Sequence, residues 1–190
     1  MNNTPITMAI LLGTTRVARQ SIKAARFVES IARQLDGVEV VFVDPAELNL
    51  PHDGDENDVE DKRYAEITAR ADAFYIVTPE YNHSFPSSLK RMLDSEYDNY
   101  TNKAAGVAGV SSGMWGGVRV CEAVQPVLHK LGLKLIQSEV YFPHVEGLFD
   151  EQGVMQPDQV DAYTAKVRKA LDELAWLART LRAGREQLAS

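Results

Sequence analysis

A short segment between residues 13 and 21 gathers residue types that bind anions. It places hydroxyl groups and two arginines directly before an expected helix, in the run Gly13-Thr14-Thr15-Arg16-Val17-Ala18-Arg19-Gln20-Ser21. The N–H groups at a helix N-terminus favour a negative ligand, and guanidinium and hydroxyl groups add hydrogen-bond donors. The segment lacks the Gly-Lys-Ser/Thr of a P-loop and keeps only one glycine of a GxGxxG fingerprint. It indicates a small phosphate site, although a capped helix with two solvated arginines explains these residues equally well.

Two further segments carry groups suited to a flat, polar ring. Residues 78–87 read TPEYNHSFPS, in which two prolines fix the backbone and Tyr81, His83 and Phe85 offer stacking surface. A stiff segment presents its backbone N–H and C=O groups in fixed directions, as recognition of a heteroaromatic ring requires. Residues 111–117 read SSGMWGG, and their glycines let the main chain approach a ligand closely. An ordinary turn with a buried tyrosine and a flexible connection are the alternatives for these two segments.

Each of the three segments follows a short apolar run. Five such runs alternate with helix-like patterns, the runs being 8–12, 38–43, 73–77, 106–110 and 133–142, and the helices 22–35, 61–71, 87–93, 117–131 and 158–181. Ser21 is the expected N-cap of the first helix. Continuous apolar runs indicate strands buried on both faces, and the alternation predicts a parallel sheet with helices on both sides. Ligands bind such sheets at the carboxyl ends of the strands, so we expect the three segments to lie together.

Length and charge restrict what the protein does. The chain has 190 residues, of which 45% are hydrophobic and 25% charged, so we expect a single globular domain over residues 1–190, with a polar, frayed tail from about 182. The net charge is −7. A negative surface disfavours nucleic acid and anionic membranes as partners.

Cysteine and acidic residues exclude other classes of site. Cys121 is the sole cysteine, so an internal disulfide and a cysteine-rich metal centre are both ruled out. No stretch approaches the roughly 18 apolar residues of a membrane span, and we expect a cytoplasmic protein. The acidic segment 52–58 places Asp53, Asp55 and Asn57 like the first three EF-hand ligands, but Asp58 stands where that loop needs glycine. We therefore expect a solvated loop and no metal site.

Taken together, the three segments resemble the NADPH-dependent FMN reductase family of flavodoxin-like proteins. The family pattern G-S-x-R is similar to residues 13–16, which read GTTR. Its TPEYN element, followed by a proline and Leu-Lys, matches residues 78–90 and is the most specific part. Its Ser/Gly-rich stretch running into G-G-x-R matches residues 112–119. The resemblance extends from about Met8 to Ile136.

The resemblance implies a flavodoxin-like three-layer α/β/α sandwich with a five-stranded parallel sheet in the order 2-1-3-4-5. It implies FMN as the cofactor, with NADPH or NADH as electron donor. The cofactor-binding residues that it implies are Thr14, Arg16, Gln20, Ser21, Pro79, Glu80, Tyr81, Asn82, Ser112, Gly113 and Gly116. It implies no catalytic side chain, because the flavin carries the chemistry.

The function expected from this resemblance is hydride transfer from NAD(P)H to FMN. Reduction of a quinone, an azo compound, another flavin, a metal oxyanion or oxygen would follow. The family further implies a homodimer or homotetramer. A flavin-binding electron carrier or redox sensor with little NAD(P)H turnover is the first alternative, and the small residues of 111–117, which leave room for a second ring, argue against it. An interaction module that has lost its cofactor is the second, and the retained Arg16, Ser21 and TPEYN argue against that.

Overall fold

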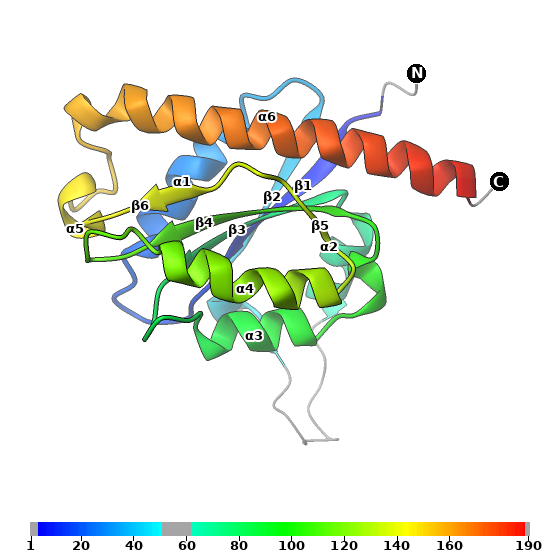
Figure 1. Ribbon diagram of the computed structural model, residues 1–190, viewed down its shortest axis with the longest axis horizontal. Helices are drawn as coiled ribbons and strands as arrows, with labels where there is room; N and C mark the ends of the chain where they lie inside the picture. Colours follow the sequence, from blue (N-terminus) through cyan, green and yellow to red (C-terminus); the bar gives the residue numbers. More distant parts are fainter. Residues whose placement is uncertain (1–3, 51–61, 189–190) are drawn as a thin grey trace.

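The computed structural model describes residues 4–50 and 62–188, and a parallel β-sheet lies at its centre (Figure 1). The strands lie in the order β2-β1-β3-β4-β5, and β6 also pairs with β4. Every one of these pairings is parallel. The predicted α/β fold and its strand order are confirmed. The strands are β1 (Ile6–Leu12), β2 (Val38–Val43), β3 (Ala73–Pro79), β4 (Ala104–Val110), β5 (Lys134–Leu135) and β6 (Val140–Phe142).

Helices cover both faces of the sheet, as Figure 1 shows. The core of one face is formed with α1 (Ser21–Ala32) and α6 (Pro157–Leu188). The other is formed with α2 (Lys62–Arg70), α3 (Ser87–Asp94) and α4 (Val118–Lys130). Three short helices complete the described chain: η1 (Pro45–Glu47), η2 (Asp98–Tyr100) and α5 (Val145–Leu148).

Glycines on β4 allow close packing at the centre of the sheet. A Cβ added at Gly106 would lie 2.8 Å from the ring of Tyr75 on β3. One added at Gly109 would lie 2.4 Å from the carbonyl oxygen of Gly117, which belongs to the loop after β4. The absence of side chains here lets that loop fold back against the end of its own strand.

The fifth apolar run, residues 133–142, forms two short strands, β5 and β6, instead of the single strand that the sequence predicts. Between them, the backbone N–H groups of Gln137 and Ser138 donate to the carboxylate of Glu173 on α6, at 2.8 and 3.1 Å. A side chain from a distant helix thus satisfies backbone groups that a neighbouring strand would otherwise pair. The prediction of one uninterrupted strand is wrong for this reason.

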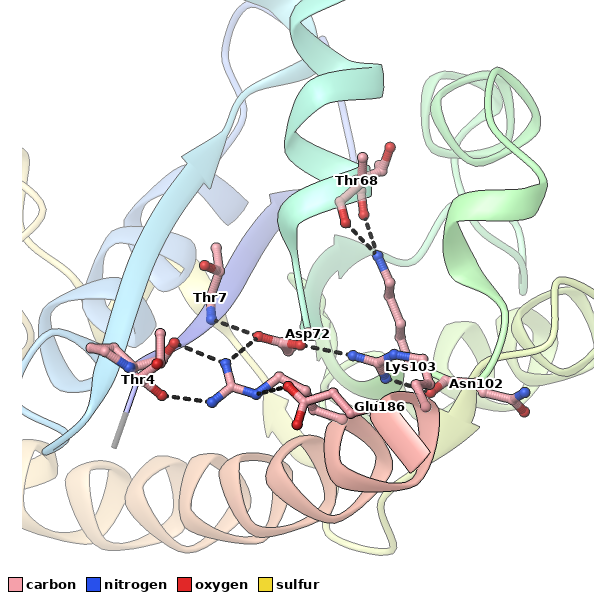
Figure 2. A network of polar contacts seen from close by, with 11 residues as sticks. Thr4, Thr7, Thr68, Asp72, Asn102, Lys103 and Glu186 are labelled. Carbon is pink, nitrogen blue, oxygen red and sulfur yellow. Dashed lines mark hydrogen bonds and ion pairs between the residues drawn. The ribbon is translucent and has the colours of Figure 1, made fainter. Parts of the chain in front are cut away.

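The C-terminal part of α6 is helical to Leu188, where the sequence suggested a frayed tail from about 182. Figure 2 shows the polar network that holds it at the amino ends of the strands. Asp72 accepts hydrogen bonds from Arg185 at 2.7 Å, from Arg182 at 3.3 Å and from the backbone N–H of Thr7 at 3.1 Å. These charge-assisted contacts fix the last turns of the helix, so the expectation of a frayed tail is wrong.

Within residues 4–50 and 62–188, the helices include none that is both long enough and apolar enough to cross a membrane.

Candidate functional site

A pocket of about 410 Å³ lies where the carboxyl ends of β1, β3 and β4 meet. Its size falls within the range of small-molecule sites, roughly 300–1,000 Å³. The three segments singled out in the sequence converge on it, together with α5. The lining residues are Arg16, Ala18, Arg19, Gln20, Ser21, Pro79, Glu80, Tyr81, Val110, Ser111, Ser112, Val145 and Glu146.

The loop from β1 to α1 is held against the end of β3. Gly13 lies so close to Thr78 that an added Cβ would meet its hydroxyl oxygen at 2.4 Å. The Oγ1 of Thr14 shares a hydrogen bond with the hydroxyl of Tyr81 at 3.2 Å and accepts one from the backbone N–H of Arg16 at 3.3 Å. Thr14 is only 2% exposed and does not line the pocket. Its contacts instead join the first segment to the second.

Unpaired polar atoms gather at the start of α1. Gln20 occupies the N-cap position with a helical backbone, so Ser21 is the first helical residue and not the predicted cap. The Nε of Arg19, the Oε1 of Gln20 and the Oγ of Ser21 are all buried, and none has a hydrogen-bond partner in the described part of the chain. Such atoms cost roughly 1–3 kcal/mol each when left unpaired. Three consecutive residues on one pocket wall therefore present groups that a polar ligand would satisfy.

The segment after β3 forms a tight turn beside the pocket. Tyr81 and Ser84 exchange backbone hydrogen bonds at 2.8 and 2.9 Å, and Asn82 and His83 between them have φ of +50° and +67°. Asn82 and His83 are exposed at the tip of the turn, away from the pocket wall. Two consecutive left-handed residues are typical of the two-residue hairpin turn. Pro79, Glu80 and Tyr81, which precede this turn, line the pocket, whereas Asn82 lies outside its lining.

Glu80 brings a carboxylate to the pocket wall. Its backbone N–H donates to the carbonyl oxygen of Val110 at 2.9 Å. This bond joins Glu80, directly after β3, to the last residue of β4. The Oε1 of Glu80 lies 3.7 Å from Nη1 of Arg119, whereas its Oε2 is buried without a hydrogen-bond partner in the described chain. It is the fourth buried, unpaired atom on a pocket-lining residue, and a bound molecule could pair it.

The segment after β4 also positions α5. The Ser111 carbonyl accepts a hydrogen bond from the N–H of Val145 at 3.2 Å, and the Gly113 carbonyl accepts one from the N–H of His144 at 3.3 Å. These contacts bring Val145 and Glu146 to the pocket. Gly116, with φ of +63°, packs instead against Tyr141 and Pro143.

The pocket therefore collects part of the predicted residue set. On its wall lie Arg16, Gln20, Ser21, Pro79, Glu80, Tyr81 and Ser112. Outside its lining lie Thr14, Asn82, Gly113 and Gly116. The residue set implied by the resemblance did not include the lining residues Ala18, Arg19, Val110, Ser111, Val145 and Glu146, although Ala18, Arg19 and Ser111 belong to the segments singled out in the sequence. The segments 13–21 and 111–117 therefore point to Arg19 and Ser111, whereas the approach of α5 depends on packing far along the chain.

The remaining candidate groups singled out in the sequence are a lone cysteine and an acidic segment. Cys121 is buried in α4, and its burial, together with nearby glutamates, raises the pKa of its thiol. No group of three or more His, Cys, Asp or Glu side chains within residues 4–50 and 62–188 is arranged to hold a metal ion. The acidic segment 52–58 lies outside the described residues.

Comparison with known proteins assigns the chain to a family. A family model described as NADPH-dependent FMN reductase matches residues 6–147. The chain belongs to the NADPH-dependent FMN reductase family. It is similar to a quinone reductase of Pseudomonas putida, with 30% identity, covering 77% of this chain and 82% of that protein. It is also similar to an NAD(P)H-dependent FMN reductase of Saccharomyces cerevisiae, with 28% identity, covering 68% of this chain and 76% of that protein.

A solved structure has the same fold. The flavoenzyme NAD(P)H:(acceptor) oxidoreductase from Paracoccus denitrificans superposes with a TM-score of 0.71 at 22% identity, covering 89% of this chain and 97% of that one. Membership of the NADPH-dependent FMN reductase family makes this protein an oxidoreductase that uses FMN and NAD(P)H and acts on small molecules. The pocket fits such a cofactor, because its unpaired donors stand at a helix N-terminus, where phosphate groups bind.

Proposed function

We propose that this protein binds FMN in the pocket, with the phosphate at the N-terminus of α1, and that it reduces an uncharged quinone at the expense of NAD(P)H. The three consecutive residues with buried, unpaired polar atoms on the pocket wall carry the proposal. When bound, FMN supplies the hydride chemistry between nicotinamide and acceptor. The chain's own residues bind and orient the reactants.

The phosphate end is built from α1 and the loop before it. The Ser21 hydroxyl and the Arg19 Nε–H are donors without partners in the described part of the chain, and Arg16 adds a second positive charge at the same wall. An anion there also meets the free N–H groups of the first helical turn. The unpaired Oε1 of Gln20 can accept a hydrogen bond from a hydroxyl of the ribityl chain.

The ring end lies between the segments after β3 and β4. Pro79, Glu80 and Tyr81 form one wall, and Ser111 and Ser112 form the other. The unpaired Oε2 of Glu80 can accept a hydrogen bond from a polar N–H or O–H of a bound molecule. Backbone N–H groups here would stabilise negative charge that develops on a reduced ring, in the manner of an oxyanion hole.

Charge favours a neutral acceptor over a metal oxyanion. Glu80 and Glu146 both line the pocket, and the whole chain carries a net charge of −7. Once a phosphate offsets the arginines, a second anion would approach a negative surface. Met114 and Trp115, exposed in the same loop as Ser112, offer an apolar surface to a flat, uncharged ring. The quinone reductases among the curated relatives agree with this choice.

A homodimer or homotetramer in the cytoplasm is the assembly and location that we propose with this function. Exposed Tyr97 and, on α6, exposed Trp176 supply candidate contact surface. Light scattering at micromolar protein concentration should give a mass of two or four chains of 21.1 kDa each. A monomer of 21.1 kDa as the sole species would contradict the proposed assembly.

Flavin binding is the first test. FMN is titrated into purified protein while its fluorescence is followed, and NADPH or NADH is then added without oxygen. We expect saturable quenching, followed by bleaching that is faster than for free FMN. Ser21→Ala should weaken FMN binding roughly tenfold, because it removes one donor to a charged group. The matched variant Ser30→Ala, which changes an exposed serine of the same helix, should bind FMN as wild type does. Absence of flavin binding would refute the proposal.

Acceptor choice is tested by steady-state rates with benzoquinone and with chromate. We expect kcat/KM for the uncharged quinone to exceed that for chromate. Glu146→Gln should raise kcat/KM for chromate a few-fold and leave the quinone value unchanged, because it removes one like charge at the pocket. Equal effects on both acceptors would show that Glu146 does not act through charge.

A further inference from the structure

A buried ion pair joins the anion-binding loop to the end of β2. Nη2 of Arg19 contacts Oδ2 of Asp44, the residue directly after the strand. The side chains of this pair are only 14% and 5% exposed. The other carboxylate oxygen of Asp44 accepts a hydrogen bond from the N–H of Ala46 at 2.9 Å and so caps η1. Asp44 is therefore held from two sides, by backbone and by Arg19.

The contacts of Arg19 fix the direction of its Nε–H donor. Its Nη1 donates to the carbonyl oxygen of Arg16 at 3.4 Å, and its Nη2 donates to Oδ2 of Asp44. Because a guanidinium group is planar and rigid, these two contacts also orient its Nε–H. That Nε is buried, lacks a hydrogen-bond partner in the described chain, and belongs to a residue on the pocket wall.

We propose that Asp44 is a positioning residue for phosphate binding, acting through Arg19. It holds the guanidinium so that Nε–H is presented to a phosphate oxygen of the bound flavin nucleotide. The inference rests on the proposed function, because it takes the α1 end of the pocket as the phosphate site. Asp44 itself is absent from the pocket lining, so it acts on the ligand only through its partner.

A carboxylate suits this role better than a neutral group. An arginine buried beside an empty anion site would be an uncompensated charge, which is strongly destabilising. With Asp44 in place the guanidinium stays buried and oriented before the ligand arrives. The Arg19 side chain then loses less conformational entropy when the phosphate binds, which is the general advantage of a preorganised site.

Asp44 could instead serve only as the cap of η1, and substitution can separate the two roles. Asp44→Asn keeps a side-chain oxygen for the N–H of Ala46 but removes the charge that holds Arg19. Asp72→Asn is the matched control, since Asp72 also pairs with arginines but lies at the opposite ends of the strands. If Asp44→Asn does not fold by near-UV circular dichroism, Asp44→Ser, which retains a capping oxygen, replaces it.

The experiment is a double-mutant cycle on the Kd for FMN, measured by fluorescence quenching, with riboflavin as the ligand that lacks a phosphate. We expect Asp44→Asn to raise the Kd for FMN about tenfold and that for riboflavin less than twofold. In the Arg19→Ala background, Asp44→Asn should change the Kd for FMN less than twofold. Asp72→Asn should leave the Kd for FMN unchanged.

Three results would overturn the inference while leaving the proposed function intact. One is an Asp44→Asn protein that binds FMN as tightly as wild type or more tightly. Another is an Asp44→Asn effect of the same size with and without Arg19, which would assign Asp44 to structure alone. The third is Arg19→Ala binding FMN normally. Wild-type protein that fails to bind FMN at all would refute the proposed function itself, and the inference with it.

Discussion

Lys103 makes the stability of this fold depend on pH in an unusual direction. The residue directly precedes β4 and is 7% exposed. Its ammonium group donates to the carbonyl oxygens of Thr68 and Ala69, at 2.6 and 3.0 Å, at the C-terminal end of α2 (Figure 2). Burial, with a smaller contribution from Arg185, lowers the pKa of Lys103 from 10.5 to about 8, and the nearby Asp72 only partly opposes this.

The sign of the effect follows from proton binding in the two states. Between pH 8 and 10.5, the unfolded chain holds a proton on this lysine that the folded protein has released. Stability therefore rises with pH across that window. The complete difference between a folded pKa of about 8 and an unfolded pKa of 10.5 corresponds to roughly 3 kcal/mol. Between pH 7 and pH 9 the gain from this lysine is about 1 kcal/mol.

The assay compares wild type with Lys103→Met by urea unfolding at pH 7, 8 and 9. We expect wild type to gain about 1 kcal/mol relative to the variant between pH 7 and pH 9, because Met cannot release a proton. Taking the difference between the proteins removes the contribution of the Cys121 thiol, whose raised pKa lowers stability at alkaline pH in both. Lys134→Met, which replaces an exposed lysine, should show the same change of unfolding free energy with pH as wild type. A difference between wild type and Lys103→Met that stays constant with pH would refute the reasoning.

Three further predictions test the structure. Asp72→Asn should lower the free energy of unfolding by about 2 kcal/mol in urea, since it breaks partly buried ion pairs with Arg182 and Arg185; a loss below about 0.5 kcal/mol would show that the network is not stabilising. His83→Gly should raise stability by about 0.5 kcal/mol, because φ of +67° is strained for histidine, and should leave the Kd for FMN unchanged. The thiol of Cys121 should react with a disulfide reagent at pH 8 only after unfolding, since it is fully buried and neutral; rapid labelling of native protein would contradict its placement.

The parts of the site that could be predicted are those fixed by local sequence. A strand followed by a hydroxyl-rich loop and a helix places Arg16, Gln20 and Ser21 at a carboxyl strand end, whatever the rest of the chain does. The stiff segment after β3 is local in the same sense, and Pro79, Glu80 and Tyr81 reach the pocket. Thr14 lies in the right loop, but its hydroxyl turns to Tyr81 instead of the pocket, and only the packed structure decides between the two.

The parts that could not be predicted depend on contacts between distant residues. The fifth strand is interrupted because Glu173, 36 positions beyond Gln137, takes two backbone N–H groups. Glu146 reaches the pocket because the chain after β6 turns back onto Ser111. Residues 182–188 are polar in sequence, yet they remain helical because Asp72 pairs with two of their arginines. The local sequence pattern predicts none of these contacts.

The two ends of the sheet differ in how the buried polar groups of their described residues are satisfied, and this difference supports the proposal that the ligand binds at the carboxyl ends of the strands. At the amino ends, both carboxylate oxygens of Asp72 have partners and the ammonium of Lys103 has two. At the carboxyl ends, Arg19, Gln20 and Glu80 each keep a buried atom that has no partner among residues 4–50 and 62–188, and all three residues line one pocket. A protein that can pair its buried groups at one end but leaves them open at the other is preorganised for a polar ligand there. The Arg19–Asp44 pair shows how this is achieved, because one carboxylate holds the guanidinium in place and leaves its Nε–H open.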